Sequence, residues 1–258
     1  MRPRRHPSGL LVPDERIVGP RLCEMFAATH LIGFGVGGDS FSPLDLTPAL
    51  WVRSDLGITK DGSDLVSAWA DQSGNARDFA EATNKPLWVD ALVGGFPAIR
   101  FDGTNDILAT ASFSQVLPVH VFCIFNSVSW TSEEGIYGGT TNPSLRLFQF
   151  SSTPEVRMNG GTATTAAQSP TVGTFFLSNA YYNSATSNYH ALNNGAYSAS
   201  TADIGTGNPG GFQLGVGYDN GAGWSNVEIA EFIVYGSEIA GADLTNILSY
   251  FQTRYGLW

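Results

Sequence analysis

Turn-forming residues divide most of this chain into short runs, and this division limits its fold more than any other feature. From residue 46 to residue 235, Gly, Asn, Asp and Ser separate runs of apolar and β-branched residues, and no helical period lies between the runs. Closely spaced strands without interleaved helices are typical of an antiparallel sandwich. The expected strands are Leu50–Arg53, Val66–Trp69, Ala98–Phe101, Ile107–Ala109, Val119–Ser127, Leu145–Ser151, Glu155–Met158, Phe175–Tyr182, Asn188–Leu192, Phe212–Gly217 and Val227–Tyr235.

One amphipathic helix is expected at the C-terminal end. Apolar residues spaced at i, i+3, i+4, i+7 and i+11 form a single stripe, Asp243 and Arg254 lie in its first and last turns, and Gly256 supplies a stop. This stripe should pack against the sandwich, so the role expected for the helix is structural. The stripe consists of Leu244, Ile247, Leu248, Phe251 and Tyr255.

The first 46 residues differ in composition from the rest of the chain, and this composition predicts an extended arm. Prolines and glycines interrupt every period, and the segment has too few apolar residues in register to form a core. Five arginines could form bidentate bonds with carboxylates, while apolar side chains could fill grooves on a partner. We therefore expect 1–46 to be a docking arm and 47–258 to be the folded domain. The predicted docking residues are Arg2, Arg4, Arg5, Arg16, Arg21, Leu22 and Phe26.

The charge balance excludes several classes of partner for the main domain. Residues 1–21 hold five of the 13 basic and two of the 23 acidic residues, so the remainder has 8 basic and 21 acidic residues, a formal charge of −13. An acidic body repels phosphate backbones, which argues against nucleic-acid binding. No apolar run is long enough to span a membrane, and the basic start breaks at Pro13 before a signal-peptide core can form.

Three blocks resemble the laminin-G-like jelly-roll modules of the concanavalin A-like lectin/glucanase superfamily. They are LTPALWVRSDLGIT…SAWADQSGN (47–75), FPAIRFDGTNDIL (96–108) and VEIAEFIVYGSEIAGADLTNILSYFQTRYGL (227–257), in the expected order. The resemblance implies an all-β antiparallel jelly-roll sandwich with one C-terminal α-helix. Such modules occur in bacterial surface proteins and bacteriophage virion proteins. The fold hosts lectins, hydrolases and structural modules, so it does not decide the function.

The sequence lacks the catalytic strand motif of glycoside hydrolases with this fold. Glycoside hydrolases of this fold resemble one another in a Glu-x-Asp-x-Glu strand motif, which places close carboxylates on one face of the strand. The nearest pair here, Glu228 and Glu231, has a spacing of three, which predicts opposite faces and argues against hydrolysis. His120 lies in a buried-type strand and is interpreted as a hydrogen-bonded core residue, and no catalytic residue or metal ligand set is predicted.

Two loops offer oxygen atoms of the kind that Ca²⁺ prefers. Neither has the ordered spacing of a calcium loop, so turn formation is the favoured interpretation and no cofactor is predicted, with Ca²⁺ kept as the less favoured alternative. The oxygen-bearing residues are Asp71, Ser73 and Asn75 in the first loop and Asp102, Asn105 and Asp106 in the second.

A glycan site would need exposed aromatic rings with amide or carboxylate neighbours. The loop with Tyr218, Asp219, Asn220 and Trp224 is the best candidate, and Trp130 is second. A packing role at the core or rim is favoured for Trp224.

The functional expectation is a non-enzymatic bacteriophage virion protein, either a capsid decoration protein or a tail-tip component. Synthesis in the bacterial host cytoplasm fits two unpaired cysteines in different surroundings and the lack of Asn-x-Ser/Thr acceptor sites. Its expected partners are other virion proteins, which the arm would contact, and further copies of the chain within the assembly. The alternatives are a lectin that binds a surface polysaccharide and, less favoured, a glycan hydrolase.

Overall fold

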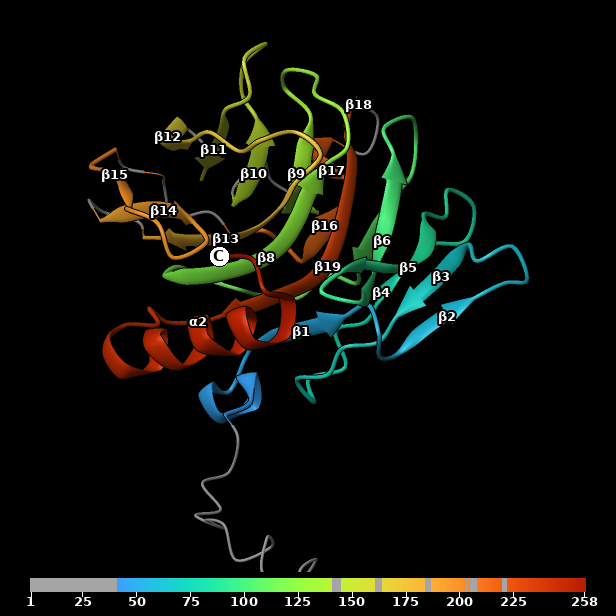
Figure 1. Ribbon diagram of the computed structural model, residues 1–258, viewed down its shortest axis with the longest axis horizontal. Coiled ribbons are helices and arrows are strands. Elements are labelled where there is room, and N and C mark those ends of the chain that lie inside the picture. Colours follow the sequence, from blue (N-terminus) through green and yellow to red (C-terminus); the bar gives the residue numbers. More distant parts are fainter. Residues whose placement is uncertain are drawn as a thin grey trace, which may run out of the picture. The chain divides into compact units, whose positions relative to one another are not determined.

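Two stacked, mostly antiparallel β-sheets form the body of the protein in the computed structural model (Figure 1). The structure describes residues 41–140, 145–160, 164–183, 187–202, 204, 208–219 and 222–258, and Phe41–Trp258 form one compact unit. Within these residues the first sheet has eight strands and the second has eleven. The predicted arm residues Arg2, Arg4, Arg5, Arg16, Arg21, Leu22 and Phe26 lie outside the described residues.

The eight-stranded sheet is centred on the long strands β8 and β19. In spatial order it contains β15 (Ser198–Ser200), β14 (Asn188–Leu192), β13 (Phe175–Tyr182), β8 (Val119–Ser127), β19 (Asn226–Tyr235), β6 (Phe96–Asp102) and β5 (Leu87–Val93). The first strand, β1 (Leu50–Arg53), pairs with β19 beside β6.

The eleven-stranded sheet is built from shorter strands. Its spatial order is β12 (Thr164–Gln168), β11 (Val156–Asn159), β10 (Arg146–Gln149), β9 (Gly135–Gly139), β16 (Phe212–Leu214), β7 (Leu108–Thr110), β4 (Phe79–Ala80), β3 (Val66–Trp69) and β2 (Ile58–Lys60). The hairpin of β17 (Val216–Asp219) and β18 (Ala222–Trp224) joins it through a parallel bridge between β18 and β9.

The alternating side chains of β8 explain why Val119–Phe125 is nearly all apolar. Val121 and Phe125 point into the core between the sheets, whereas Phe122 and Ile124 point to the other face of the same sheet. Each of the four is completely buried. A strand covered on both faces is apolar at most positions, and the sequence predicted such a strand here.

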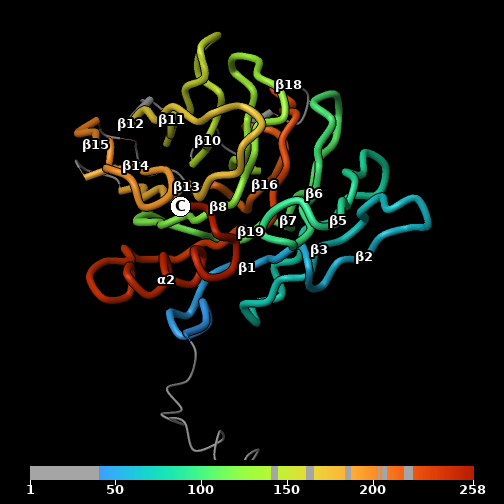
Figure 2. Tube along the Cα trace, in the orientation of Figure 1, coloured from blue at the N-terminus to red at the C-terminus, as the bar shows by residue number. Residues whose placement is uncertain are grey.

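The layer that covers the second face is the helix α2 (Gly241–Tyr255), which runs beside β1 and β8 (Figure 2). Ile247, Phe251 and Tyr255 of the predicted stripe are buried, and Leu244 and Leu248 are partly buried against the same cluster. The helix ends at Gly256, whose left-handed φ of 64° lets its N–H bond to the Gln252 carbonyl at 2.9 Å. The predicted C-terminal helix is therefore confirmed.

A short 3₁₀ helix, η1 (Pro43–Leu46), also packs on this side of the sheet. The Tyr235 hydroxyl donates to the Pro43 carbonyl at 3.1 Å, and Phe41 meets Tyr250 edge-on at 6.5 Å between ring centroids. Residues 41–46, which the sequence analysis assigned to the arm, thus belong to the compact unit.

The predicted fold class, an all-β antiparallel sandwich with one C-terminal helix, is confirmed. Five predicted strands have the same bounds in the structure, namely β1, β3, β8, β13 and β14. The predicted strand Phe212–Gly217 is divided at Gly215, whose φ is 81°, into β16 and β17. Strands such as β2, β4 and β18 have only two or three residues and were missed, since such runs show no alternation.

Candidate functional site

An open cleft of about 320 Å³ lies among loops at one end of the sandwich. In this region β18 lies beside the loops that follow β6 and β8 (Figure 1). Three separate stretches of the chain form its walls. They are the turn after β6, the loop between β8 and β9, and the β17–β18 hairpin. The lining residues are Gly103, Thr131, Ser132, Glu133, Glu134, Gly223 and Trp224.

Strand pairing fixes the position of Trp224 at this cleft. Trp224 is the β18 residue that bridges Gly135 of β9, and it also pairs with Val216 of β17. The next residue, Ser225, is buried, and its hydroxyl donates to the Gly135 carbonyl at 2.6 Å. Because both neighbours of Trp224 in the sheet are fixed, this half-buried residue has a defined place in the cleft wall.

The close approach of two backbones makes this arrangement dependent on glycine. A Cβ atom on Gly135 would lie 1.9 Å from the Gly217 Cα atom, far inside van der Waals contact. The β17–β18 hairpin can therefore cross β9 only because neither strand carries a side chain there.

The backbone at the two glutamates, Glu133 and Glu134, is held by Gln149 of β10. The Glu133 N–H donates to the Gln149 carbonyl at 2.6 Å, and the Gln149 N–H donates to the Glu134 carbonyl at 2.8 Å. The Gln149 side chain accepts the Thr131 N–H at 2.9 Å, so both ends of this loop bond to one residue of β10. This anchoring places two adjacent carboxyl groups on the rim beside Trp224.

The two carboxyl groups differ in their surroundings. Burial raises the pKa of Glu134 to about 7, although a hydrogen bond from Thr131 lowers the pKa in part. Glu133 is exposed, and one of its oxygens lies 3.7 Å from Nη2 of Arg146. At neutral pH the Glu134 carboxyl is therefore close to half protonated and can both donate and accept a hydrogen bond.

The chemistry of the cleft suits a polyhydroxylated ligand. An indole face takes the apolar C–H surface of a ring, and carboxyl and hydroxyl groups exchange hydrogen bonds with ligand hydroxyls.

The residues that the sequence predicted for glycan binding lie in different places in the structure. Trp224 lies in the cleft. Asn220 and the side chains of Tyr218 and Asp219 lie outside what the structure describes. Trp130 packs against the core, and its indole N–H donates to the Ser151 carbonyl at 2.6 Å.

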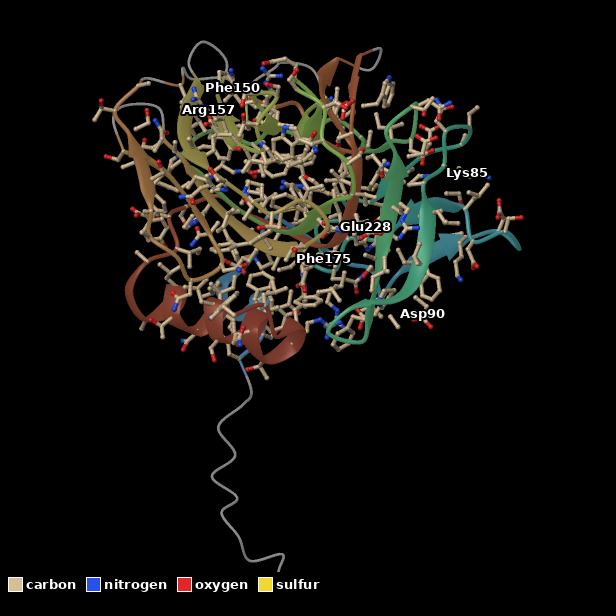
Figure 3. All side chains as sticks on the ribbon, turned by 45° about the horizontal axis from the view of Figure 1, so that its top comes forward. Lys85, Asp90, Phe150, Arg157, Phe175 and Glu228 are labelled. Atoms are coloured by element: carbon tan, nitrogen blue, oxygen red, sulfur yellow. The ribbon has the colours of Figure 1, made fainter. Side chains whose placement is uncertain are left out.

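The structure corrects the expected orientation of Glu228 and Glu231. A β-bulge in β19 between Ile229 and Glu231 shifts the alternation by one residue, so both glutamates point to the face that α2 covers (Figure 3 labels Glu228). Glu228 is buried, pairs with Arg100 and accepts the Asn126 amide at 2.9 Å.

Glu231 is completely buried beneath α2 and holds the helix to the sheet. Its carboxylate accepts bonds from Trp51 Nε1 at 2.7 Å, Tyr250 OH at 2.8 Å and Tyr255 OH at 2.7 Å. Arg254 Nε lies 3.8 Å from the same carboxylate. Both glutamates of the β19 pair are thus occupied by structural partners.

The two oxygen-rich loops form turns. Asp71 accepts backbone N–H groups of Trp51, Ser73 and Arg77 at 2.9–3.0 Å, and Asp102 accepts the Thr104 N–H at 2.8 Å. Among the described residues no three His, Cys, Asp or Glu side chains gather as a metal site would require. Within the same part of the chain, no helix is long and apolar enough to cross a membrane.

His120 is a core residue, as predicted. It is completely buried, its Nε2 lies 2.6 Å from Asn179 Oδ1, and its Nδ1 accepts the Ile239 N–H at 3.0 Å. Burial lowers the pKa of this histidine to about 4, so the ring is neutral near pH 7.

Comparisons with known proteins relate this chain to carbohydrate-active structures. Trypanosoma rangeli sialidase in complex with sialic acid superposes with a TM-score of 0.56 at 14% identity, over 77% of this chain and 32% of the sialidase. Domain 4 of AbnA, a GH43 extracellular arabinanase from Geobacillus stearothermophilus in complex with arabinotriose, superposes with a TM-score of 0.54 at 13% identity. The match covers 73% of this chain and 92% of the AbnA domain. A GH54 α-L-arabinofuranosidase mutant superposes with a TM-score of 0.54 at 14% identity, over 72% of this chain and 50% of the arabinofuranosidase.

These similarities show the fold alone, because every identity is below 15%. The chain spans about a third of the length of the sialidase. No family model and no curated protein matches the sequence. The β-sandwich part of the predicted resemblance is therefore confirmed, while membership of the laminin-G-like modules is not.

The comparisons correct the functional prediction. The sequence predicted a non-enzymatic bacteriophage virion protein, and a glycan hydrolase was the less favoured alternative because the Glu-x-Asp-x-Glu motif is absent. Solved structures that share this fold include a sialidase, a domain of an arabinanase and an arabinofuranosidase. One absent motif could not exclude catalysis, since a fold of this kind can carry its carboxylates on loops as well as on strands.

Proposed function

We propose that the β-sandwich is a carbohydrate-active module that binds a glycan in the Trp224 cleft. The observation that carries the proposal is the placement of one half-buried indole ring beside two carboxyl groups in a single open cleft of about 320 Å³. Membership of the laminin-G-like group is part of the same proposal.

The arrangement of the cleft supports a sugar more than an apolar ligand. The indole of Trp224 offers an apolar face, whereas Glu133, Glu134 and the hydroxyl residues Thr131 and Ser132 offer hydrogen-bonding groups around it. A sugar ring has the same division, with C–H groups on its faces and hydroxyls on its edge.

The structural neighbours support the choice of probes. Arabinotriose is bound to the AbnA domain, and sialic acid is bound to the sialidase. A glycan array that includes neutral arabinan, xylan and glucan fragments together with sialylated glycans covers both chemistries.

The test compares Trp224→Ala with Tyr197→Ala in array binding and titration calorimetry. Tyr197 is a matched control because its ring is 44% exposed and does not line the cleft. Loss of the Trp224 ring should weaken binding of the array ligand at least about tenfold, equivalent to about 1.4 kcal/mol. Equal affinities of wild type and Trp224→Ala for every bound glycan would refute the site.

A second candidate function is glycoside hydrolysis in the same cleft, and the environment of Glu134 favours it. A general acid must be protonated at working pH, and the pKa of Glu134 is raised to about 7 by burial. Glu133 supplies the second carboxyl group that such hydrolysis requires.

Hydrolysis is tested with the glycans that the cleft binds and with nitrophenyl glycosides. Glu134→Gln should abolish turnover and retain binding, while Glu155→Gln, a change outside the cleft, should leave both unchanged. Absence of turnover on every bound glycan, or equal turnover by Glu134→Gln, would eliminate this candidate.

A further inference from the structure

A second groove, of about 350 Å³, lies along α2 next to the turn that follows β14. It shares no lining residue with the Trp224 cleft. The lining residues are Asn194, Thr245, Leu248, Ser249, Gln252 and Trp258.

The backbone of Trp258 is held in place at the edge of this groove. The Trp258 N–H donates to Oε1 of Gln252 at 3.0 Å, and the Gln252 amide donates back to the Trp258 carbonyl. The preceding carbonyl, of Leu257, accepts the Asn193 amide at 3.5 Å, and Asn193 Oδ1 accepts the Leu177 N–H at 2.9 Å. The last residues are thus bonded to both α2 and the sheet, and the Trp258 side chain stays 39% exposed.

The groove wall is polar but carries no charged side chain. Thr245 and Ser249 present hydroxyls one turn apart on α2, and Asn194 presents an amide across from them. The Thr245 hydroxyl donates to the Gly241 carbonyl at 3.2 Å, so its oxygen serves a ligand as an acceptor. Leu248 supplies an apolar surface between these groups.

We infer that this groove is a second carbohydrate site, which takes a neutral sugar unit stacked on Trp258. The Trp258 backbone is bonded to α2 before a ligand arrives, which limits the ordering entropy lost on binding. The uncharged hydroxyl and amide groups match the hydroxyls of a neutral sugar, whereas a carboxylated or sulfated sugar would find no cation. The inference does not depend on binding in the Trp224 cleft.

The test is a nuclear magnetic resonance titration of the full chain, ¹⁵N-labelled, with no tag at its C-terminal end. The chain has six tryptophans, so its indole N–H signals can be resolved and assigned by single substitution to Phe. The probes are neutral arabino-, xylo-, cello-, manno- and N-acetylchito-trisaccharides, with sialyllactose and a uronic acid trisaccharide as charged counterparts.

At least one neutral trisaccharide should shift the Trp258 indole signal in a saturable way at millimolar concentration. Trp258→Ala should abolish that binding event, and Trp224→Ala should leave it unchanged, so failure at one cleft is distinguishable from failure at the other. Because Trp258 is exposed, the Ala variant should fold, which its amide spectrum verifies. The inference is overturned if no neutral probe moves the Trp258 signal, or if charged probes move it equally well.

Discussion

Replacement of Glu231 by Leu should strongly destabilise the packing of α2 on the sheet. The substitution removes the common acceptor of Trp51, Tyr250 and Tyr255, three donors whose bonds measure 2.7–2.8 Å. A buried donor without a partner costs about 1–3 kcal/mol, which gives about 3–9 kcal/mol for the three. Burial raises the pKa of Glu231, so part of this loss is offset when the charged group is removed.

The expected net loss is about 3–5 kcal/mol in the free energy of unfolding, the range for breaking a buried ionic cluster from one side. Urea unfolding followed by circular dichroism measures it, and the melting temperature should fall by roughly 6–20 °C. Removing the donors as well, with Tyr250→Phe and Tyr255→Phe in the Leu variant, should recover part of the loss. A loss below about 1 kcal/mol for Glu231→Leu alone would refute the claim that this carboxylate anchors α2.

Three further predictions concern the helix and the titrating groups. Phe251→Ala should lower the free energy of unfolding by about 3–5 kcal/mol and Leu248→Ala by distinctly less, because Phe251 is completely buried and Leu248 lines the α2 groove. Equal losses of the two variants in urea unfolding would contradict this packing. The pKa of His120 is lowered to about 4 by burial, so as the pH falls the unfolded state binds a proton before the folded state does. The free energy of unfolding should therefore fall from pH 6.5 toward pH 4, and it should fall less in His120→Asn. Identical stability–pH profiles of the wild type and this variant would count against the neutral buried ring. The pKa of Glu134 is raised to about 7, so its contribution to the stability of the folded state is greatest at low pH and declines as the pH rises from 4.5 through 7. Glu134→Gln should lessen that decline. An unchanged dependence of the melting temperature on pH in this variant would argue against the burial of the carboxyl.

The sequence predicted the elements whose signal is local. Val119–Phe125 is nearly all apolar because both faces of β8 are covered, and Phe175–Tyr182 is a long β-type run between turn residues. The terminal helix follows from its 3.6-residue apolar period and the stop at Gly256.

The errors arise where contacts between distant residues decide the outcome. The bulge after Ile229 moves Glu231 onto the face of Glu228, and a spacing of three residues contains no sign of it. Trp130 looked like an exposed ring, but its loop folds back so that its indole reaches the Ser151 carbonyl.

The candidate cleft was predicted only in part, through Trp224. Glu133 and Glu134 read as an ordinary charged loop, and they reach Trp224 only because Gly135 bridges β18 across about ninety residues. The pair of glycines at the crossing, Gly135 and Gly217, is the one signal in the sequence that could have indicated a close backbone approach.

The measurement that tests the proposed function most directly is titration calorimetry of the wild-type chain and Trp224→Ala with a glycan selected on the array. The account predicts saturable binding by the wild type and at least about tenfold weaker binding by Trp224→Ala, with Tyr197→Ala unchanged. Unaltered affinity in Trp224→Ala, in a variant whose circular dichroism and melting temperature match the wild type, would contradict the assignment of a glycan to this cleft.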